Sequence, residues 1–311
     1  MQDFRLRLRL LSPLGTPWQS DTVCGHLAWR VAQGAGGLSV EEFLASFREG
    51  RPPFLLSDGC PGDLLPRPFL PPPPEEAGDR EARARARCHF VSPEEFTALR
   101  RATTVTWQSA PDPWRFVQTP HAALSRATET TGTVGEGDDS GRFFLTDLST
   151  LVEGDTLALY LRAEGDWAAW VADLLEATAP LGFGRDRSTG AGAYQVLGLE
   201  PWAGFAPFPE ADGFVSLSSY CPAREDPTRG RWRLRLKYGK LGENAGDGNP
   251  FKRPLLQLEP GALFYTGAAP RPWYGRAVSD LAPGFPEALQ CCYTLAVPCR
   301  CPQELREEPV P

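Results

Sequence analysis

Residues 182–192 read Gly182-Phe183-Gly184-Arg185-Asp186-Arg187-Ser188-Thr189-Gly190-Ala191-Gly192, and they decide how the N-terminal part of the chain is interpreted. Four of these eleven residues are glycine. Because glycine adopts positive φ and lets other backbone approach closely, we expect a tightly built loop. The stretch follows a predicted amphipathic helix over residues 166–179 and precedes a predicted strand over residues 194–199.

This glycine-rich loop also carries groups that bind phosphate. Arg185, Arg187, Ser188 and Thr189 offer side-chain donors beside the exposed N–H groups of a glycine-rich backbone. A nucleotide P-loop would need GxxxxGK[ST] after a strand, and neither that lysine nor that order is present. The alternative is that this loop only connects the helix to the strand and binds no ligand.

Working outward from the loop, the first 200 residues show the order strand, helix, strand, strand, helix, strand. Residues 4–11 alternate apolar residues with arginine, and a helix is expected from Asp21. A second short helix over residues 39–47 starts at a capping box of Ser39 and Glu42. Strands are expected at residues 142–148 and 156–162. This is the order of a ferredoxin-like (RRM-like) domain, with the proline-rich residues 50–74 inserted after the first helix and free of regular structure.

Residues 201–311 are expected to form a second, β-rich domain that is a degraded copy of the same fold. Strands are predicted at residues 213–220, 231–238, 262–265 and 292–297. In residues 231–238, Trp232, Leu234, Leu236 and Tyr238 alternate with cations, so we expect the apolar side to pack against a core and the cations to face solvent. The fold class is therefore α+β with two domains, residues 1–200 and 201–311.

The charge distribution limits the kind of partner. The net charge is −7, yet residues 224–240 carry seven cations and two carboxylates. One local basic strip on an acidic body fits a protein with a single polyanion groove and several protein neighbours, while a solvated strand face is the plainer explanation.

Hydropathy and cysteine usage indicate the compartment. No apolar run reaches the length of a membrane span, and the start of the chain alternates rather than forming a signal peptide, so a soluble cytoplasmic protein is expected. The eight cysteines are expected to be reduced thiols. Their spacing does not favour zinc, and neither a metal nor another cofactor is predicted.

The loop and four further segments resemble the RAMP superfamily of CRISPR proteins, in particular the Cas-five-like group that supplies subunit four of the type III-A (Csm) effector complex. The segments occur in the family's order between residues 4 and 265. They are Ser20-Asp21-Thr22, residues 52–58 followed by Leu65-Pro66-Arg67-Pro68, residues 121–128 followed by a glycine-rich stretch and Phe143-Phe144, and residues 249–254 followed by 259–264.

The resemblance implies two ferredoxin-like domains that grip the repeat-derived tag at the 5′ end of the guide RNA. It also implies docking to the large, polymerase-like Cas-ten-type subunit and to the backbone RAMP subunit, Csm subunit three. The equivalent subunit of a type III-B or III-D complex stays an alternative. The expected RNA-binding residues are Gly182, Phe183, Gly184, Arg185, Arg187, Ser188, Thr189, Gly190, Gly192, His121, Arg126, Ser20, Lys252 and Arg253. Phe183 and Phe251 could stack on bases or belong to the core.

Some RAMP relatives cut RNA with a histidine as general base, so the histidines of this chain are the candidates for a catalytic residue. The chain has only His26, His89 and His121, and we expect a non-catalytic protein. The first alternative is a RAMP endoribonuclease that processes guide-RNA precursor with His121 as the base. The second is a protein-only scaffold whose basic strip faces an acidic partner.

Overall fold

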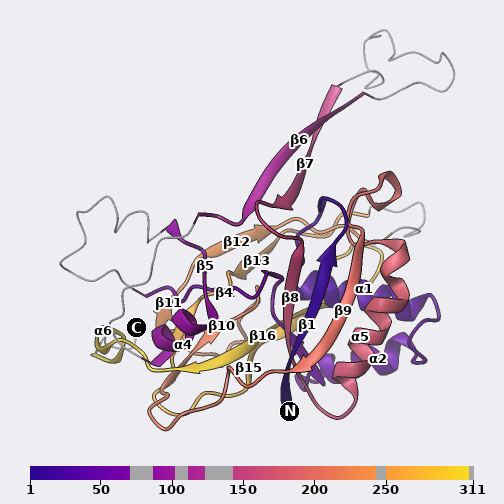
Figure 1. Ribbon diagram of the computed structural model, residues 1–311. Helices are drawn as coiled ribbons and strands as arrows, with labels where there is room; N and C mark the ends of the chain where they lie inside the picture. The colour runs from indigo at the N-terminus through magenta and orange to yellow at the C-terminus, as the bar shows by residue number, and fades with distance from the viewer. Residues whose placement is uncertain (71–86, 102–110, 123–142, 243–249, 308–311) are drawn as a thin grey trace, which may run out of the picture.

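The computed structural model describes residues 1–70, 87–101, 111–122, 143–242 and 250–307. It is an α+β protein with two larger antiparallel sheets and three two-stranded ones (Figure 1). The sequence elements 194–199, 262–265 and 292–297 are found as strands with bounds shifted by a few residues. Within these ranges no helix is long and apolar enough to span a membrane.

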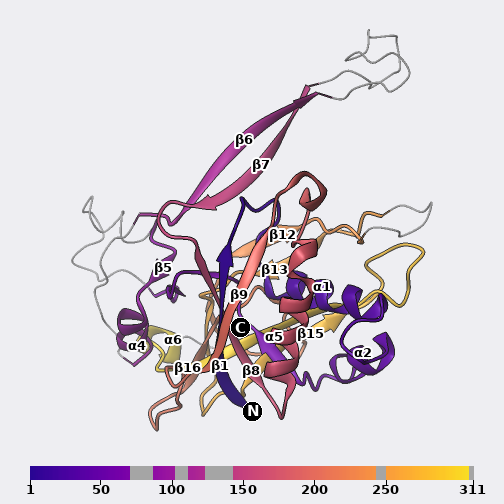
Figure 2. The same cartoon turned by 45° about the vertical axis from the view of Figure 1, so that its right-hand side comes forward.

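The N-terminal sheet has the strand order β2-β8-β1-β9, with β3 also paired to β8. Leu6 and Leu8 of β1 are fully buried, and Arg5 on the opposite face pairs with Asp63 and Glu200, as the alternation predicts. Helices α1, α2 and α5 lie together beside this sheet (Figures 1 and 2). The elements of this half are β1 (Gln2–Leu10), α1 (Ser20–Ala32), α2 (Val40–Arg48), β2 (Phe54–Leu56), β3 (Cys60–Pro61), β8 (Thr156–Ala163), α5 (Trp167–Thr178) and β9 (Tyr194–Pro201).

Two expectations for this half are corrected. The strand beside β8 is β2, which comes from the proline-rich residues 50–74 that were expected to lack regular structure. Its three residues are too few to produce a recognisable alternation. The strand predicted at residues 142–148 is present as β7 (Phe143–Leu151), but it forms a separate two-stranded sheet with β6 (Trp114–Ala122) and touches residues 11–19 through a bridge between Ser149 and Leu14. This β6–β7 ribbon projects from the body of the molecule in both views (Figures 1 and 2).

The C-terminal sheet has the order β11-β14-β10-β16-β15. Its longest strand, β16, also contacts α1 and β2 of the N-terminal half. The largest buried cluster runs from Leu6 and Leu27 to Val215 and Leu295, so both halves share one core. The remaining elements are β4 (Leu65–Pro66), β5 (Phe90–Val91), α4 (Pro93–Arg101), β10 (Gly213–Ser216), β11 (Gly230–Arg231), β12 (Leu234–Lys237), β13 (Leu255–Leu258), β14 (Leu263–Tyr265), β15 (Trp273–Val278), β16 (Gln290–Cys299) and α6 (Gln303–Glu307).

The outward face of β12 is the reverse of the prediction. Leu234, Leu236 and Tyr238 are 56%, 51% and 73% exposed. The cations between them pair with carboxylates: Lys237 Nζ lies 2.6 Å from Asp21, and Arg235 Nε lies 3.5 Å from Glu259. Alternation predicts two unlike faces but not which one turns inward, and here the buried carboxylate of Asp21 decides it.

Candidate nucleic-acid interface

The glycine-rich loop, residues 182–192, depends on its glycines. Gly184 has φ +81°, and a Cβ there would lie 2.6 Å from Thr16 Cβ. Gly192 has φ +71°, and a Cβ there would lie 2.0 Å from the carbonyl oxygen of Phe183. Both positions therefore need positive φ and close backbone approach, as the sequence indicates. Between them η3 (Arg187–Thr189) forms a single turn.

The loop is packed onto residues 11–19, the segment that leads from β1 into α1. The amide of Gly192 donates to the carbonyl of Pro13 at 2.8 Å, and the amide of Arg185 donates to Thr16 Oγ1 at 3.0 Å. The ring of Phe183 is fully buried and stacks on Trp18 at 4.1 Å between centroids. Phe183 therefore supports the loop from the core side, where its ring does not meet a base on the surface.

Arg185 links the loop to the base of the β6–β7 ribbon. Its guanidinium donates to the carbonyl oxygens of Gly15 and Asp147. Beside this contact, Leu14 and Ser149 exchange two backbone hydrogen bonds of 2.7 and 2.9 Å. The side chain expected to bind phosphate is thus engaged with backbone carbonyls, and it fixes where the ribbon leaves the body.

The outer part of the loop faces solvent. Ser188, Thr189 and Gly190 are exposed, and Arg187 is half-buried. Burial lowers the pKa of His26 in α1 to about 3, and the nearby charges of Arg30 and Arg187 add to this effect. His26 is therefore neutral at neutral pH. The positive charges of Arg30 and Arg187 both lie near it, where the loop meets α1.

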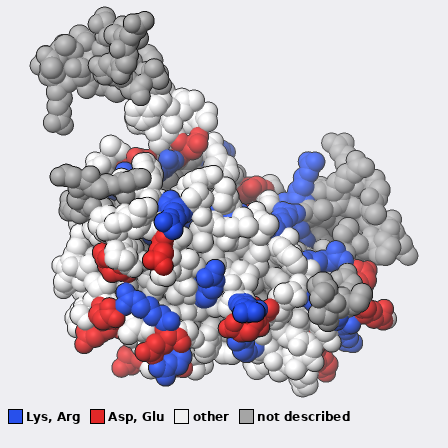
Figure 3. All heavy atoms as spheres, turned by 180° about the vertical axis from the view of Figure 1, so that it is seen from behind, with Lys and Arg blue, Asp and Glu red and all other residues white. Residues whose placement is uncertain are grey.

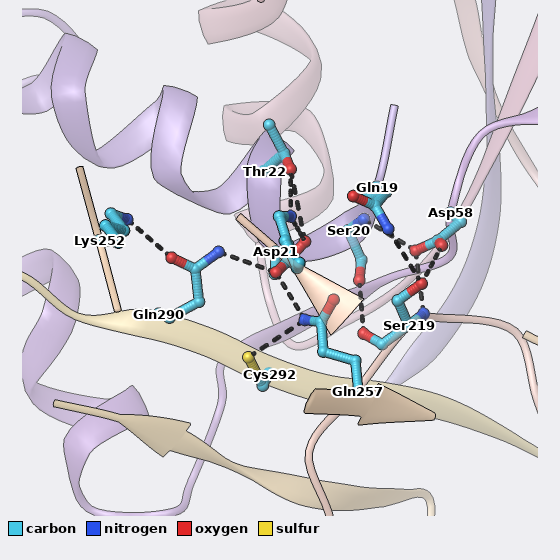
Figure 4. A network of polar contacts seen from close by, with 11 residues as sticks. Gln19, Ser20, Asp21, Thr22, Asp58, Ser219, Lys252, Gln257, Gln290 and Cys292 are labelled. Atoms are coloured by element: carbon cyan, nitrogen blue, oxygen red, sulfur yellow. Dashed lines mark hydrogen bonds and ion pairs between the residues drawn. The ribbon is translucent and has the colours of Figure 1, made fainter. Parts of the chain in front are cut away.

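Ser20 and Lys252 belong to a polar network that joins α1 to the C-terminal half (Figure 4). Ser20 is 4% exposed; its amide donates to Asp58 Oδ1 at 2.9 Å, and its hydroxyl donates to the carbonyl of Ser219. Lys252 Nζ donates to Gln290 Oε1 at 2.7 Å, and burial lowers the pKa of its ammonium group. Both side chains face this interior joint, so phosphate binding by Ser20 is not supported.

The centre of that joint is Asp21, which is 1% exposed. It accepts from Lys237 Nζ at 2.6 Å, Gln257 Nε2 at 2.7 Å and Gln290 Nε2 at 2.8 Å. Burial alone would raise the pKa of Asp21, but the charge of Lys237 and these three hydrogen bonds outweigh it and lower the pKa. From the sequence, Asp21 was expected only to begin a helix and to belong to the Ser20-Asp21-Thr22 segment of the family resemblance; a carboxylate on the inner face of α1 was the missed indication.

The remaining expected residues are spread over the surface. His121 lies on the ribbon, with its ring stacked on Phe144 at 5.3 Å between centroids. Arg253 is exposed beside β13. Arg126 lies outside the described residues. The structure thus brings together the loop, residues 11–19 and the ribbon base, while Lys252 and Arg253 lie by the β12–β13 hairpin.

On the face turned away in Figure 1, the Lys and Arg side chains of the described residues lie among Asp and Glu (Figure 3). The eight cysteines are buried free thiols, and the described residues contain no group of three or more His, Cys, Asp or Glu side chains arranged to hold a metal ion.

No family model and no curated protein matches the sequence. The fold does match solved structures over nearly the whole chain. A chain of the Csm1-Csm4 cassette in complex with AMPPNP is 16% identical with a TM-score of 0.61, covering 97% of this chain and 99% of that one. A chain of the cassette in complex with cA4 is 17% identical with a TM-score of 0.60, covering 99% and 100%.

A chain of the Csm3-Csm4 subcomplex in the type III-A CRISPR-Cas interference complex is 10% identical, with a TM-score of 0.58 and coverage of 96% and 99%. The chain therefore has the fold of a chain found in the Csm1-Csm4 cassette and in the Csm3-Csm4 subcomplex. Csm4 is the subunit common to these assemblies, and the fold resembles Csm4 from end to end.

Proposed function

We infer that this protein is the guide-RNA-binding, non-catalytic subunit of a type III-A CRISPR interference complex, and that it clamps the 5′ repeat-derived tag. The end-to-end likeness to the Csm4 fold carries the proposal. The glycine-rich loop adds to it, because the loop lies between α5 and β9 and exposes the side chains of Ser188 and Thr189. The Thr189 hydroxyl and the amides of Thr189 and Gly190 already donate to carbonyls within the loop.

We interpret the N-terminal half as a ferredoxin-like RAMP domain and the C-terminal half as a degraded second copy. Support for the first comes from the sheet order β2-β8-β1-β9 with α1 and α5 as its two connecting helices. The second half keeps an antiparallel sheet, but its only described helix is α6. The shared core makes the two copies one rigid platform for the loop and the ribbon.

The surface chemistry suits single-stranded RNA. Such RNA is held by contacts to its phosphates and by stacking of splayed bases on aromatic or guanidinium planes. The outer loop offers phosphate donors, Arg253 adds an exposed cation, and Phe116 on the ribbon is 71% exposed. Because the overall charge is acidic, we expect RNA binding to be confined to the outer loop, Arg253 and the ribbon.

The same proposal includes two protein partners. The matched structures pair Csm4 with Csm1 in one assembly and with Csm3 in the other. By that likeness, this chain would link the large polymerase-like subunit to the backbone of the complex. Co-expression with these subunits and a repeat-spacer array, followed by sequencing of the bound RNA, tests the proposal. RNAs with a shared 5′ tag are expected, and RNAs with random 5′ ends would refute the clamp.

A point variant sharpens this test. Ser188→Glu places a carboxylate on the exposed loop, and we expect RNA affinity to fall on the order of tenfold because that charge opposes phosphate. Ser279→Glu makes the same change on an exposed residue after β15 and serves as the control. Equal RNA affinity of both variants would remove the loop from the interface.

The endoribonuclease alternative is tested on the isolated protein. His121 is the accessible histidine on the projecting ribbon, whereas His26 is buried and neutral. Incubation of the chain with repeat RNA is expected to release no cleavage product. Specific product that disappears in His121→Ala, with RNA binding kept, would overturn the non-catalytic assignment.

A further inference from the structure

The outer face of the β12–β13 hairpin is apolar and exposed. Leu236 and Leu256, directly opposite each other across the two strands, are 51% and 54% exposed. Leu234, Tyr238, Phe251 and Trp232 extend the patch and are 56%, 73%, 63% and 44% exposed. We call these six residues the outer leucine face. Contiguous apolar surface of this kind marks a binding site on a protein.

The hairpin cannot turn this face inward without breaking the polar joint. Its opposite side carries Lys237 and Gln257, both hydrogen-bonded to the buried carboxylate of Asp21. Because side chains alternate, a slip of one residue would bury the leucines and remove the cation from Asp21. Leaving one member of a buried ion pair without its partner is strongly destabilising. The exposure of the leucines is therefore built into the register.

The border of the face is cationic. Arg253 is exposed, and Lys240 lies 5.9 Å from the centroid of the Phe251 ring. Among the described residues, neither of these two cations has a carboxylate partner within 4 Å. The complementary surface is then an apolar ridge bordered by Asp or Glu, the usual arrangement of an interface with an apolar centre and a polar rim.

Other occupants fit less well. RNA bases stack on aromatic or guanidinium planes, whereas the centre of this face is the aliphatic pair Leu236 and Leu256. A second copy of the chain would bring one cationic border against another. We propose that the outer leucine face is the docking surface for a neighbouring protein subunit with an apolar, carboxylate-bordered ridge. This rests on the proposed role as a subunit of an effector complex.

The test uses Leu236→Asp and Leu256→Asp in the full chain, co-expressed with the two partner subunits and guide RNA. Both positions are half exposed, so the urea midpoint of the isolated chain should stay near that of the wild type. Leu197→Asp on β9, at a 40% exposed leucine, is the matched control. We expect the two hairpin variants to associate at least about tenfold more weakly with one protein partner. The control should associate as strongly as the wild type.

Each outcome is decisive. Unchanged recovery of both partners overturns the proposal, while loss of RNA with both partners retained assigns the face to RNA instead. If the wild type sediments as a dimer and the Leu236→Asp variant as a monomer, the face is assigned to a second copy of the chain. If the wild type binds neither subunit nor RNA, the proposed function fails as well; if it binds both, only the docking proposal is at stake.

Discussion

The joint at Asp21 predicts a large and specific loss of stability in Asp21→Asn. Asp21 is 1% exposed, and its carboxylate accepts hydrogen bonds of 2.6–2.8 Å from Lys237, Gln257 and Gln290 and a longer one of 3.4 Å from Thr22. The isosteric amide can no longer balance the ammonium of Lys237, and its NH2 group cannot accept. Removing one member of a buried pair costs about 3–5 kcal/mol. Because the Lys237 side chain keeps 15% exposure and can reach water, we expect the lower end, about 3 kcal/mol.

Urea unfolding followed by tryptophan fluorescence measures this loss as a lower midpoint at unchanged slope. Asp173→Asn, an exposed residue of α5, makes the same change in charge and should shift the free energy of unfolding by less than about 0.5 kcal/mol. Lys237→Met should be destabilising alone, and the double variant Asp21→Asn/Lys237→Met should cost less than the sum of the two single changes. Additive costs, or a loss in Asp21→Asn no larger than in the control, would refute the argument.

The pH dependence provides a second check on Asp21. Its pKa in the folded protein is lowered, so its stabilisation is complete above the unfolded-state pKa near 3.8 and is lost as the pH falls through the folded-state pKa. The stability difference between wild type and Asp21→Asn should therefore be constant at neutral pH and shrink below about pH 4. Burial raises the pKa of Asp58, and the charge of Asp21 adds to this rise, so the part of the Asp58 contribution that is due to burial cancels in the difference.

Three further substitutions and one chemical modification test other parts of the structure. Gly184→Ala should cost more stability than Gly190→Ala, because both have positive φ but only Gly184 meets a neighbouring side chain within 4 Å; equal costs would contradict the close approach. Gly25→Ala, inside α1 with open space at its Cβ, should raise the free energy of unfolding by about 0.5–1 kcal/mol. Arg185→Ala should speed hydrogen exchange at the base of the β6–β7 ribbon without changing it in the C-terminal sheet. A thiol reagent should titrate few of the eight cysteines in the native protein and all of them in denaturant, since every one is buried.

The elements that sequence predicts well are those with local causes. Ser39 and Glu42 form the predicted capping box, with the Glu42 amide 3.2 Å from Ser39 Oγ and the Ser39 amide 2.8 Å from Glu42 Oε2. The amphipathic helix and the alternating first strand appear as α5 and β1. In each case the deciding contacts lie within a few residues or follow one period.

Longer-range partners decided the rest. Nothing near Arg185 in sequence indicates that its guanidinium bonds to carbonyls 170 and 38 positions away. The inward turn of Lys237 likewise depends on a carboxylate 216 positions away. Such partners follow from the assembled fold, so the pattern of residues 231–238 predicted a strand correctly but placed its two faces the wrong way round.

The polar joint also explains why scattered segments of sequence together indicated one family. Residues 20–22, 52–58 and 249–254 lie far apart along the chain, yet Figure 4 shows Ser20 bonded to Asp58, and Asp21 linked through Gln290 to Lys252. The peptide bond between Ser20 and Asp21 joins the two groups. The joint couples α1, which underlies the glycine-rich loop, to the hairpin that carries the outer leucine face. A change at Asp21 should therefore disturb both the proposed RNA grip and the proposed protein docking, although it touches neither surface. The segments that resemble the RAMP superfamily thus include residues that join α1 to the C-terminal half, away from the surfaces proposed to bind RNA and protein.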